Sequence, residues 1–170
     1  VEESEQREMR PWGYDENGWP SGFGSGKVNG LGVEYQQKYL RIEETLEHKD
    51  TAICKSGNHY SYYDINPFYV DTLDKKVVSE FIEVAYKPYY EKYGSRIEGF
   101  FTDEPQVSRN GMPWSCRIEK EYEKIYGESI REHLPKLFYR LDGYEEFRFR
   151  FWKTVRDLFT DNFMGVIGKW

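Results

Sequence analysis

Two pairs of adjacent carboxylates, Asp15-Glu16 and Asp103-Glu104, are the residues of this sequence best suited to chemistry. Each pair directly follows a short segment that is expected to form a strand. Pro105 ends the second strand, because proline cannot donate a hydrogen bond to a sheet. Cleavage of a glycosidic bond needs one protonated carboxyl for the leaving oxygen and one ionised carboxylate as base or nucleophile. The paired acids are therefore candidates for this chemistry if the two strands are parallel neighbours.

A third acid, Asp71, ends another short predicted strand at residues 68–70. It would join the same edge if that strand were also parallel to the others. Every acid here has an alternative role as a helix N-cap or as a solvated turn residue. For Asp71 that alternative is the favoured interpretation, because a helix is predicted to begin at residue 74. The three histidines are too scattered for a zinc site, and no Cys-x-x-Cys motif occurs.

The elements that must position these acids follow from hydrophobic periodicity and from Gly and Pro placement. Between the first acid pair and the next strands lies a loop at 17–26, whose four glycines and two aromatic residues indicate a shaped loop rather than a linker. The predicted strands span residues 10–14, 39–46, 51–55, 59–65, 68–70 and 97–101, and the predicted helices span 74–93 with a kink near Tyr86, 117–126, 136–141 and 144–167.

Composition narrows the functional classes. The net charge of −6 argues against nucleic acid as a partner, because phosphate binding needs a basic surface. We expect no membrane span and no signal peptide, since no apolar run is long enough and the N-terminus is acidic. Aromatic residues make up 18% of the chain, with 15 Tyr, 11 Phe and 5 Trp, which suits surfaces that stack on sugars as well as aromatic cores.

Two motifs carry a resemblance to a known family. Tyr14–Gly22 (Tyr-Asp-Glu-Asn-Gly-Trp-Pro-Ser-Gly) and Gly99–Pro105 (Gly-Phe-Phe-Thr-Asp-Glu-Pro) resemble two signatures of α-L-rhamnosidase-like glycoside hydrolases. The segments Tyr69–Ile82 and Met112–Ser115 are also similar to that family, in the same order. The resemblance implies a TIM-barrel catalytic domain and hydrolysis of α-L-rhamnosides by carboxylate acid/base catalysis.

The same resemblance implies roles for individual residues. Glu104 would be the catalytic acid, with Asp103 beside it in the sugar site. The predicted substrate-binding residues are Asp15, Glu16, Trp19, Asp71 and Trp114. Family members are much longer than this chain, so the second catalytic carboxylate is expected beyond Trp170.

We therefore predict an α/β fold: a partial (β/α)8 TIM barrel with a small antiparallel β excursion at 39–65 and a helix-rich C-terminal half. Residues 1–170 are expected to form a single domain that is a fragment of a larger catalytic barrel. The expected partner is a carbohydrate, together with a second copy of the chain or the rest of the parent protein. No cofactor is predicted, although calcium could be held at an acidic rim. The alternative function is a non-catalytic carbohydrate-binding or structural fragment.

Overall fold

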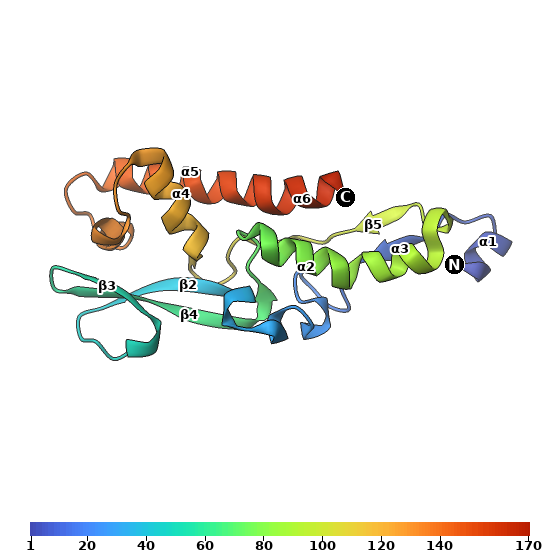
Figure 1. The fold of residues 1–170 in the computed structure, drawn as a ribbon, viewed down its shortest axis with the longest axis horizontal. Coiled ribbons are helices and arrows are strands. Elements are labelled where there is room, and N and C mark those ends of the chain that lie inside the picture. Colours follow the sequence, from blue (N-terminus) through green and yellow to red (C-terminus); the bar gives the residue numbers. More distant parts are fainter.

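Two separate sheets and a set of helices make up the fold, which a computed structural model describes for residues 1–170 (Figure 1). Strand β1 (Trp12–Tyr14) pairs in parallel with β5 (Gly99–Phe101). The second sheet is antiparallel and has the strand order β3-β4-β2-β6. Its strands are β2 (Gln36–Glu43), β3 (Ala52–Ser56), β4 (His59–Val70) and β6 (Met112–Trp114).

The predicted partial (β/α)8 barrel is wrong, and the fold is a small mixed α/β arrangement. A barrel needs successive parallel strands, whereas only β1 and β5 are parallel here. After Pro105 the chain turns back and adds β6 to the antiparallel sheet, where it pairs with β2. The antiparallel excursion is confirmed, although β4 continues to Val70 and absorbs the strand that we predicted separately at 68–70.

The helices largely follow the hydrophobic pattern. The predicted helix at 74–93 is two helices, α2 (Lys75–Ala85) and α3 (Lys87–Tyr93), which are separated at Tyr86 as Pro88 indicated. The prediction at 136–141 is wrong, because a 3₁₀ segment at Arg131–Leu137 contains Pro135. The remaining helices are α1 (Glu2–Gln6), α4 (Cys116–Tyr126), α5 (Tyr144–Phe159) and α6 (Gly165–Lys169), with a π-helical turn at Thr160–Met164 between the last two. None of these helices is long and apolar enough to span a bilayer.

Two apolar clusters stabilise these elements. The larger joins the antiparallel sheet to α4 and α5 and contains Leu40, Trp114 and Phe151. The smaller joins α2 to the end of β4 and to the segment after the Gly-rich loop, through residues such as Phe81 and Val70. In Figure 1 the α5–α6 rod lies on one side of the molecule and the antiparallel sheet on the other, with α2 between them.

The Gly-rich loop packs closely against this second cluster. Gly24 has a φ of 53°, and a Cβ there would lie 3.0 Å from the ring of Phe81. Gly22 has a φ of 135° and lies against the ring of Tyr69, so neither position suits a larger residue. The glycines therefore let the loop lie directly on α2 and β4, which fixes its position relative to the ends of β1 and β5.

Candidate functional site

The parallel pairing of β1 and β5 brings the two Asp-Glu pairs together. The register aligns Tyr14 with Phe101, and the amide of Asp15 donates to the Phe101 carbonyl at 3.3 Å. Ser21 of the Gly-rich loop joins both strand ends: its amide donates to the Asp103 carbonyl at 2.9 Å, and its hydroxyl accepts from the Asp103 amide at 2.7 Å. The predicted convergence at the carboxyl ends of the strands is thus confirmed for these two pairs.

Asp15 is buried, and its two carboxylate oxygens are both used by the protein. One accepts a hydrogen bond from the Ser21 hydroxyl at 2.6 Å, and the other accepts from the Tyr86 hydroxyl between α2 and α3. Burial, together with the hydrogen bond to Asp15, raises the pKa of Tyr86 above its usual range. Asp15 therefore links the Gly-rich loop to the helical layer.

The Glu16 carboxylate accepts hydrogen bonds from the backbone of the same loop. Its Oε2 accepts from the backbone amides of Gly22, Phe23 and Gly24 at 3.3, 2.6 and 2.7 Å. Its Oε1 accepts from the amide of Asn17 at 2.9 Å. A carboxylate that receives four backbone N–H groups is a strong acceptor for a tight turn. Glu16 therefore holds the loop in shape.

Glu104 differs from these acids in both environment and backbone. Its side chain is exposed and forms no hydrogen bond or ion pair with the protein. Its φ of 44° lies in the left-handed region, which costs a non-glycine residue about 1–3 kcal/mol and is enriched at functional sites. Asp103 beside it is half-buried. Partial burial and the nearby Asp103 charge raise the pKa of Tyr14 above its usual range.

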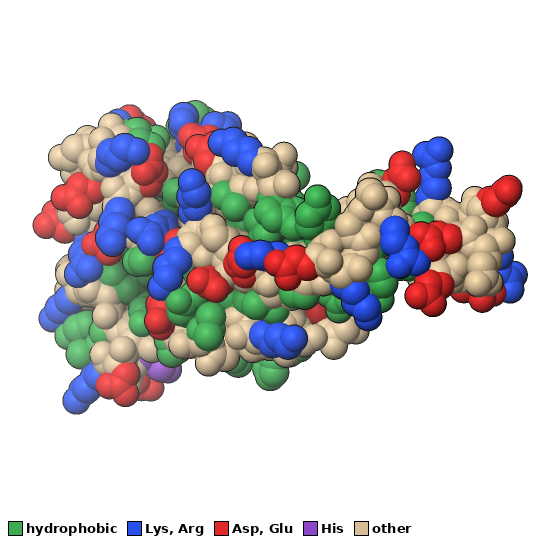
Figure 2. Space-filling model, turned by 45° about the vertical axis from the view of Figure 1, so that its right-hand side comes forward, with side chains coloured by type: hydrophobic (Ala, Val, Ile, Leu, Met, Phe, Trp, Pro, Cys, Tyr) green, Lys and Arg blue, Asp and Glu red, His purple; other side chains and the backbone are tan.

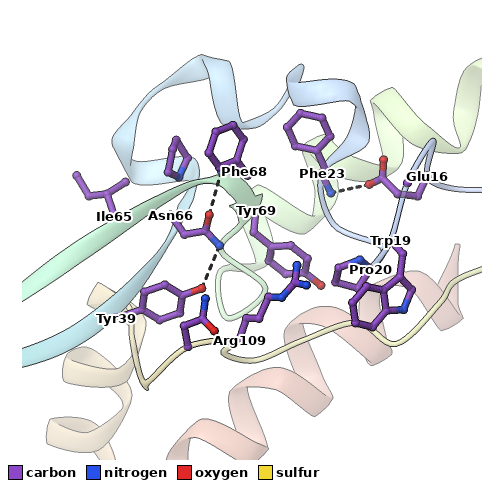
Figure 3. Close-up of a pocket in the computed structure, with 13 residues that line it drawn as sticks. Glu16, Trp19, Pro20, Phe23, Tyr39, Ile65, Asn66, Phe68, Tyr69 and Arg109 are labelled. Carbon is purple, nitrogen blue, oxygen red and sulfur yellow. Dashed lines mark hydrogen bonds between the residues drawn. The ribbon is translucent and has the colours of Figure 1, made fainter.

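An open groove of about 690 Å³ lies next to these strand ends, between the Gly-rich loop and β4 (Figure 3). Trp19 and Phe68 are its most exposed aromatic residues, with exposed fractions of 53% and 71%. Most of its other lining residues are aromatic, proline or amide-bearing, namely Pro20, Phe23, Tyr39, Asn66, Pro67, Tyr69 and Asn110, and the rest are Glu16, Gly18, Ile65 and Arg109. Aromatic faces combined with amide and hydroxyl groups are what a sugar ring requires.

Polar groups in the groove wall are held in fixed positions. The Asn66 side-chain amide donates to the Tyr39 hydroxyl at 3.0 Å and to the Gln37 side chain at 3.2 Å, and Tyr39 itself donates to Gln37 at 2.8 Å. The Asn66 side-chain oxygen accepts from the Phe68 amide at 3.1 Å (Figure 3). These hydrogen bonds hold the side chains of Tyr39 and Asn66 rigidly in the groove wall and use their donors within the protein.

Tyr69 connects the groove to the segment that carries Glu104. Its hydroxyl donates to the Ser21 carbonyl and accepts from the Gln106 amide at 2.8 Å, and burial raises its pKa. Asp103 is bonded to Ser21 and Gln106 to Tyr69, so Glu104 lies between two fixed positions. These bonds fix the backbone on either side of Glu104 next to the groove, whereas the exposed Glu104 side chain is not among the residues that line it.

Asp71 and Trp114 lie away from the groove. Asp71 is buried and accepts from the Ser115 hydroxyl at 2.7 Å and from the Leu73 amide at 3.0 Å. The N-cap of α2 is Asp74, whose side chain accepts from the Lys76 amide, so Asp71 does not cap this helix; it lies at the turn before α2, where it is buried rather than solvated. Trp114 is only 5% exposed and belongs to the larger core. The structure brings neither residue to the groove.

Asp71 gives the fold a predicted pH dependence. Burial raises its pKa to about 6, although the Ser115 hydroxyl and the Lys38 charge act in the opposite direction. Because an unfolded Asp titrates near about 3.9, the stability linked to this group is full below about pH 4 and is lost as the pH rises through about 6. The asparagine side chain of the Asp71→Asn variant cannot ionise, so this variant does not lose that stability as the pH rises.

We expect the free energy of unfolding of Asp71→Asn, relative to the wild type, to increase by roughly 1–3 kcal/mol between about pH 4 and pH 7. Urea denaturation of both proteins across this range measures it. The exposed carboxylates contribute equally to the pH dependence of both proteins, so their contribution cancels in the difference between the two free energies of unfolding. A difference that stays constant with pH would show that Asp71 does not titrate as its burial requires.

Several residues of the groove were missed by sequence reasoning, namely Tyr39, Asn66, Phe68, Tyr69 and Arg109. The only local signal was the run Asn-Pro-Phe-Tyr at 66–69, which interrupts strand alternation with a polar residue and a proline. Arg109 lies in a loop with no distinguishing motif.

The structure shows no cluster of three His, Cys, Asp or Glu side chains arranged to hold a metal ion. Comparison with protein-family models, with curated proteins and with solved structures gave no match to this chain. The fold and site define a mixed α/β protein with an open aromatic groove beside an exposed carboxylate. Its function has to be argued from that groove and those acids.

Proposed function

We propose that this chain forms the sugar site of an α-L-rhamnosidase-like glycoside hydrolase, with Glu104 as the general acid. The observation that carries the proposal is the exposed, unpaired carboxylate of Glu104 at the end of β5, where the Ser21–Asp103 and Tyr69–Gln106 hydrogen bonds fix the backbone on either side of it next to the aromatic groove. A sugar that stacks on Trp19 or Phe68 would present its glycosidic oxygen to the edge where Glu104 lies. The resemblance of the two Asp-Glu motifs to that family supports the same assignment.

Some of the acidic residues near Glu104 have a structural role, and others contribute to the sugar site. Asp15 and Glu16 use their oxygens to hold the loop, so we assign them to shaping the site. Asp103 shares the sugar site. The second carboxylate, which activates water or attacks the sugar, is assigned to another part of the same enzyme. The reaction is then proton donation from Glu104 to the leaving oxygen, coupled to attack at the sugar carbon.

The second candidate function is carbohydrate binding without hydrolysis. The carboxylates of Asp15, Glu16 and Asp71 all accept hydrogen bonds within the protein. This favours a binding function, because few carboxylates remain for acid or base catalysis. Turnover of a bound saccharide distinguishes the two functions. The complete natural gene product would bind rhamnosides without turning them over if the site were a binding site only.

Trp19→Ala is expected to weaken binding of α-L-rhamnosyl oligosaccharides by about 10-fold or more, because a well-placed Trp contributes about 2 kcal/mol or more at a binding site. Calorimetric titration measures the effect. Trp152→Ala is the matched control, since Trp152 is similarly exposed at 46% but lies on α5, outside the groove. Equal affinities for wild type and Trp19→Ala would rule out the groove as the sugar site.

A further inference from the structure

Arg109 is an unpaired cation at the edge of the groove. Its guanidinium lies over the Trp19 ring, 5.0 Å from the ring centroid, and its side chain is exposed. It forms no hydrogen bond or ion pair with the protein, whereas the neighbouring Arg41 is bonded to Asp64 at 2.7 Å and to the Asn110 carbonyl at 3.3 Å. Of the two arginines beside the groove, only Arg109 has its donors free.

The contact with Trp19 leaves the N–H donors of Arg109 without a hydrogen-bond partner. A cation–π attraction holds a guanidinium over an aromatic ring without using its N–H groups as hydrogen-bond donors to another polar atom. Two parallel N–H groups of this fork match the two oxygens of a carboxylate. Arg109 therefore lies against Trp19 at the groove with a guanidinium fork that has no partner in the protein (Figure 3).

Arg109 forms no ion pair with an acid of the groove lining or with Asp103 and Glu104 at the adjoining strand end, which lie outside that lining. Glu16 is the one acid among the lining residues, and its oxygens accept from four backbone amides of the Gly-rich loop. Arg41 is balanced by Asp64. The groove thus contains an available positive charge, although the chain as a whole has a net charge of −6.

We infer that the groove binds an acidic saccharide, and that Arg109 is the specificity-determining residue that recognises the carboxylate of a uronic acid unit. The sugar rings pack on the exposed aromatic residues while the carboxylate receives the guanidinium edge. This inference rests on the proposed function, because it specifies the substrate class of the same sugar site. A lysine at this position would supply the charge but not the planar fork.

The test is calorimetric titration of the chain with trigalacturonic acid and with its fully methyl-esterified form, in which each carboxylate is replaced by a neutral methyl ester. We expect the wild type to bind the acid at least about 10-fold more tightly than the ester, as is typical of a paired charge-assisted contact. Arg109→Gln is expected to abolish this preference, and Arg109→Lys to retain part of it. Arg140→Gln is the matched control, because Arg140 is also exposed and unpaired but lies outside the groove.

Two results would overturn the inference while leaving the proposed function intact. One is equal affinity of the wild type for acid and ester, and the other is an undiminished preference in Arg109→Gln. If only neutral rhamnosides bind, and Trp19→Ala weakens them, acidic specificity is excluded but the sugar site remains. If no saccharide binds in a manner that depends on Trp19, both proposals fail.

Discussion

Glu104→Gln is expected to reduce hydrolysis of glycosides with sugar or alkyl leaving groups by about 10²–10⁴-fold, the usual contribution of a positioned general acid. The glutamine side chain has nearly the same shape but cannot donate the proton that the departing oxygen needs. Sugar affinity and stability should change little, because Glu104 is exposed and has no partner in the protein. Steady-state kinetics of the natural gene product, with and without the substitution, measures the effect.

The leaving group provides the internal control for this experiment. Dinitrophenyl glycosides lose a weakly basic leaving group that needs little protonation, so Glu104→Gln should retain far more of its activity on them. A defect in folding or in sugar binding would reduce both substrate types equally. Unchanged turnover of alkyl and aryl rhamnosides alike would show that Glu104 is not the acid.

Glu16→Gln is expected to destabilise the protein by about 3 kcal/mol or more. The substitution removes the charge that receives four backbone amides and directs an amide NH₂ group toward one or more of these donors. Because the Gly-rich loop forms one wall of the groove, sugar binding should be lost together with stability. Chemical denaturation and calorimetric titration measure the two effects.

Glu104→Gln serves as the matched control for the substitution at Glu16, since it makes the same chemical change at an exposed carboxylate. Surface substitutions of this kind usually alter the free energy of unfolding by less than about 0.5 kcal/mol. If Glu16→Gln were as stable as Glu104→Gln, the carboxylate of Glu16 would not be holding the loop. It would then be free for a chemical role that the structure does not give it.

Local signals in the sequence predicted much of what positions the candidate site. Pro105 and the adjacent acids located the end of β5, and the glycines at 17–26 indicated a shaped loop. The alternation of an apolar face with Lys and Glu residues predicted the position of α2, and Pro88 predicted the break between α2 and α3. Each of these features depends on residues close together in the chain, which is why pattern alone sufficed.

Apart from the helix wrongly predicted at 136–141, the failures involve contacts between distant segments. Nothing local to Met112–Trp114 shows that it pairs with β2, so no strand is predicted there and the antiparallel sheet gains a strand that the sequence analysis lacks. The role of Asp71 depends on Ser115, which is 44 positions away. The groove combines the Gly-rich loop with β4 and Arg109, and their proximity exists only in the folded chain. Tertiary packing, rather than local propensity, decides these features.

The most direct test of the central claim is a crystal structure of the natural gene product, with Glu104→Gln to prevent turnover, bound to an α-L-rhamnosyl oligosaccharide. We expect a sugar ring packed on Trp19 in the groove, with the glycosidic oxygen about 3 Å from the side chain at position 104, within hydrogen-bonding distance. A saccharide bound elsewhere, or a glycosidic oxygen out of reach of position 104, would contradict it.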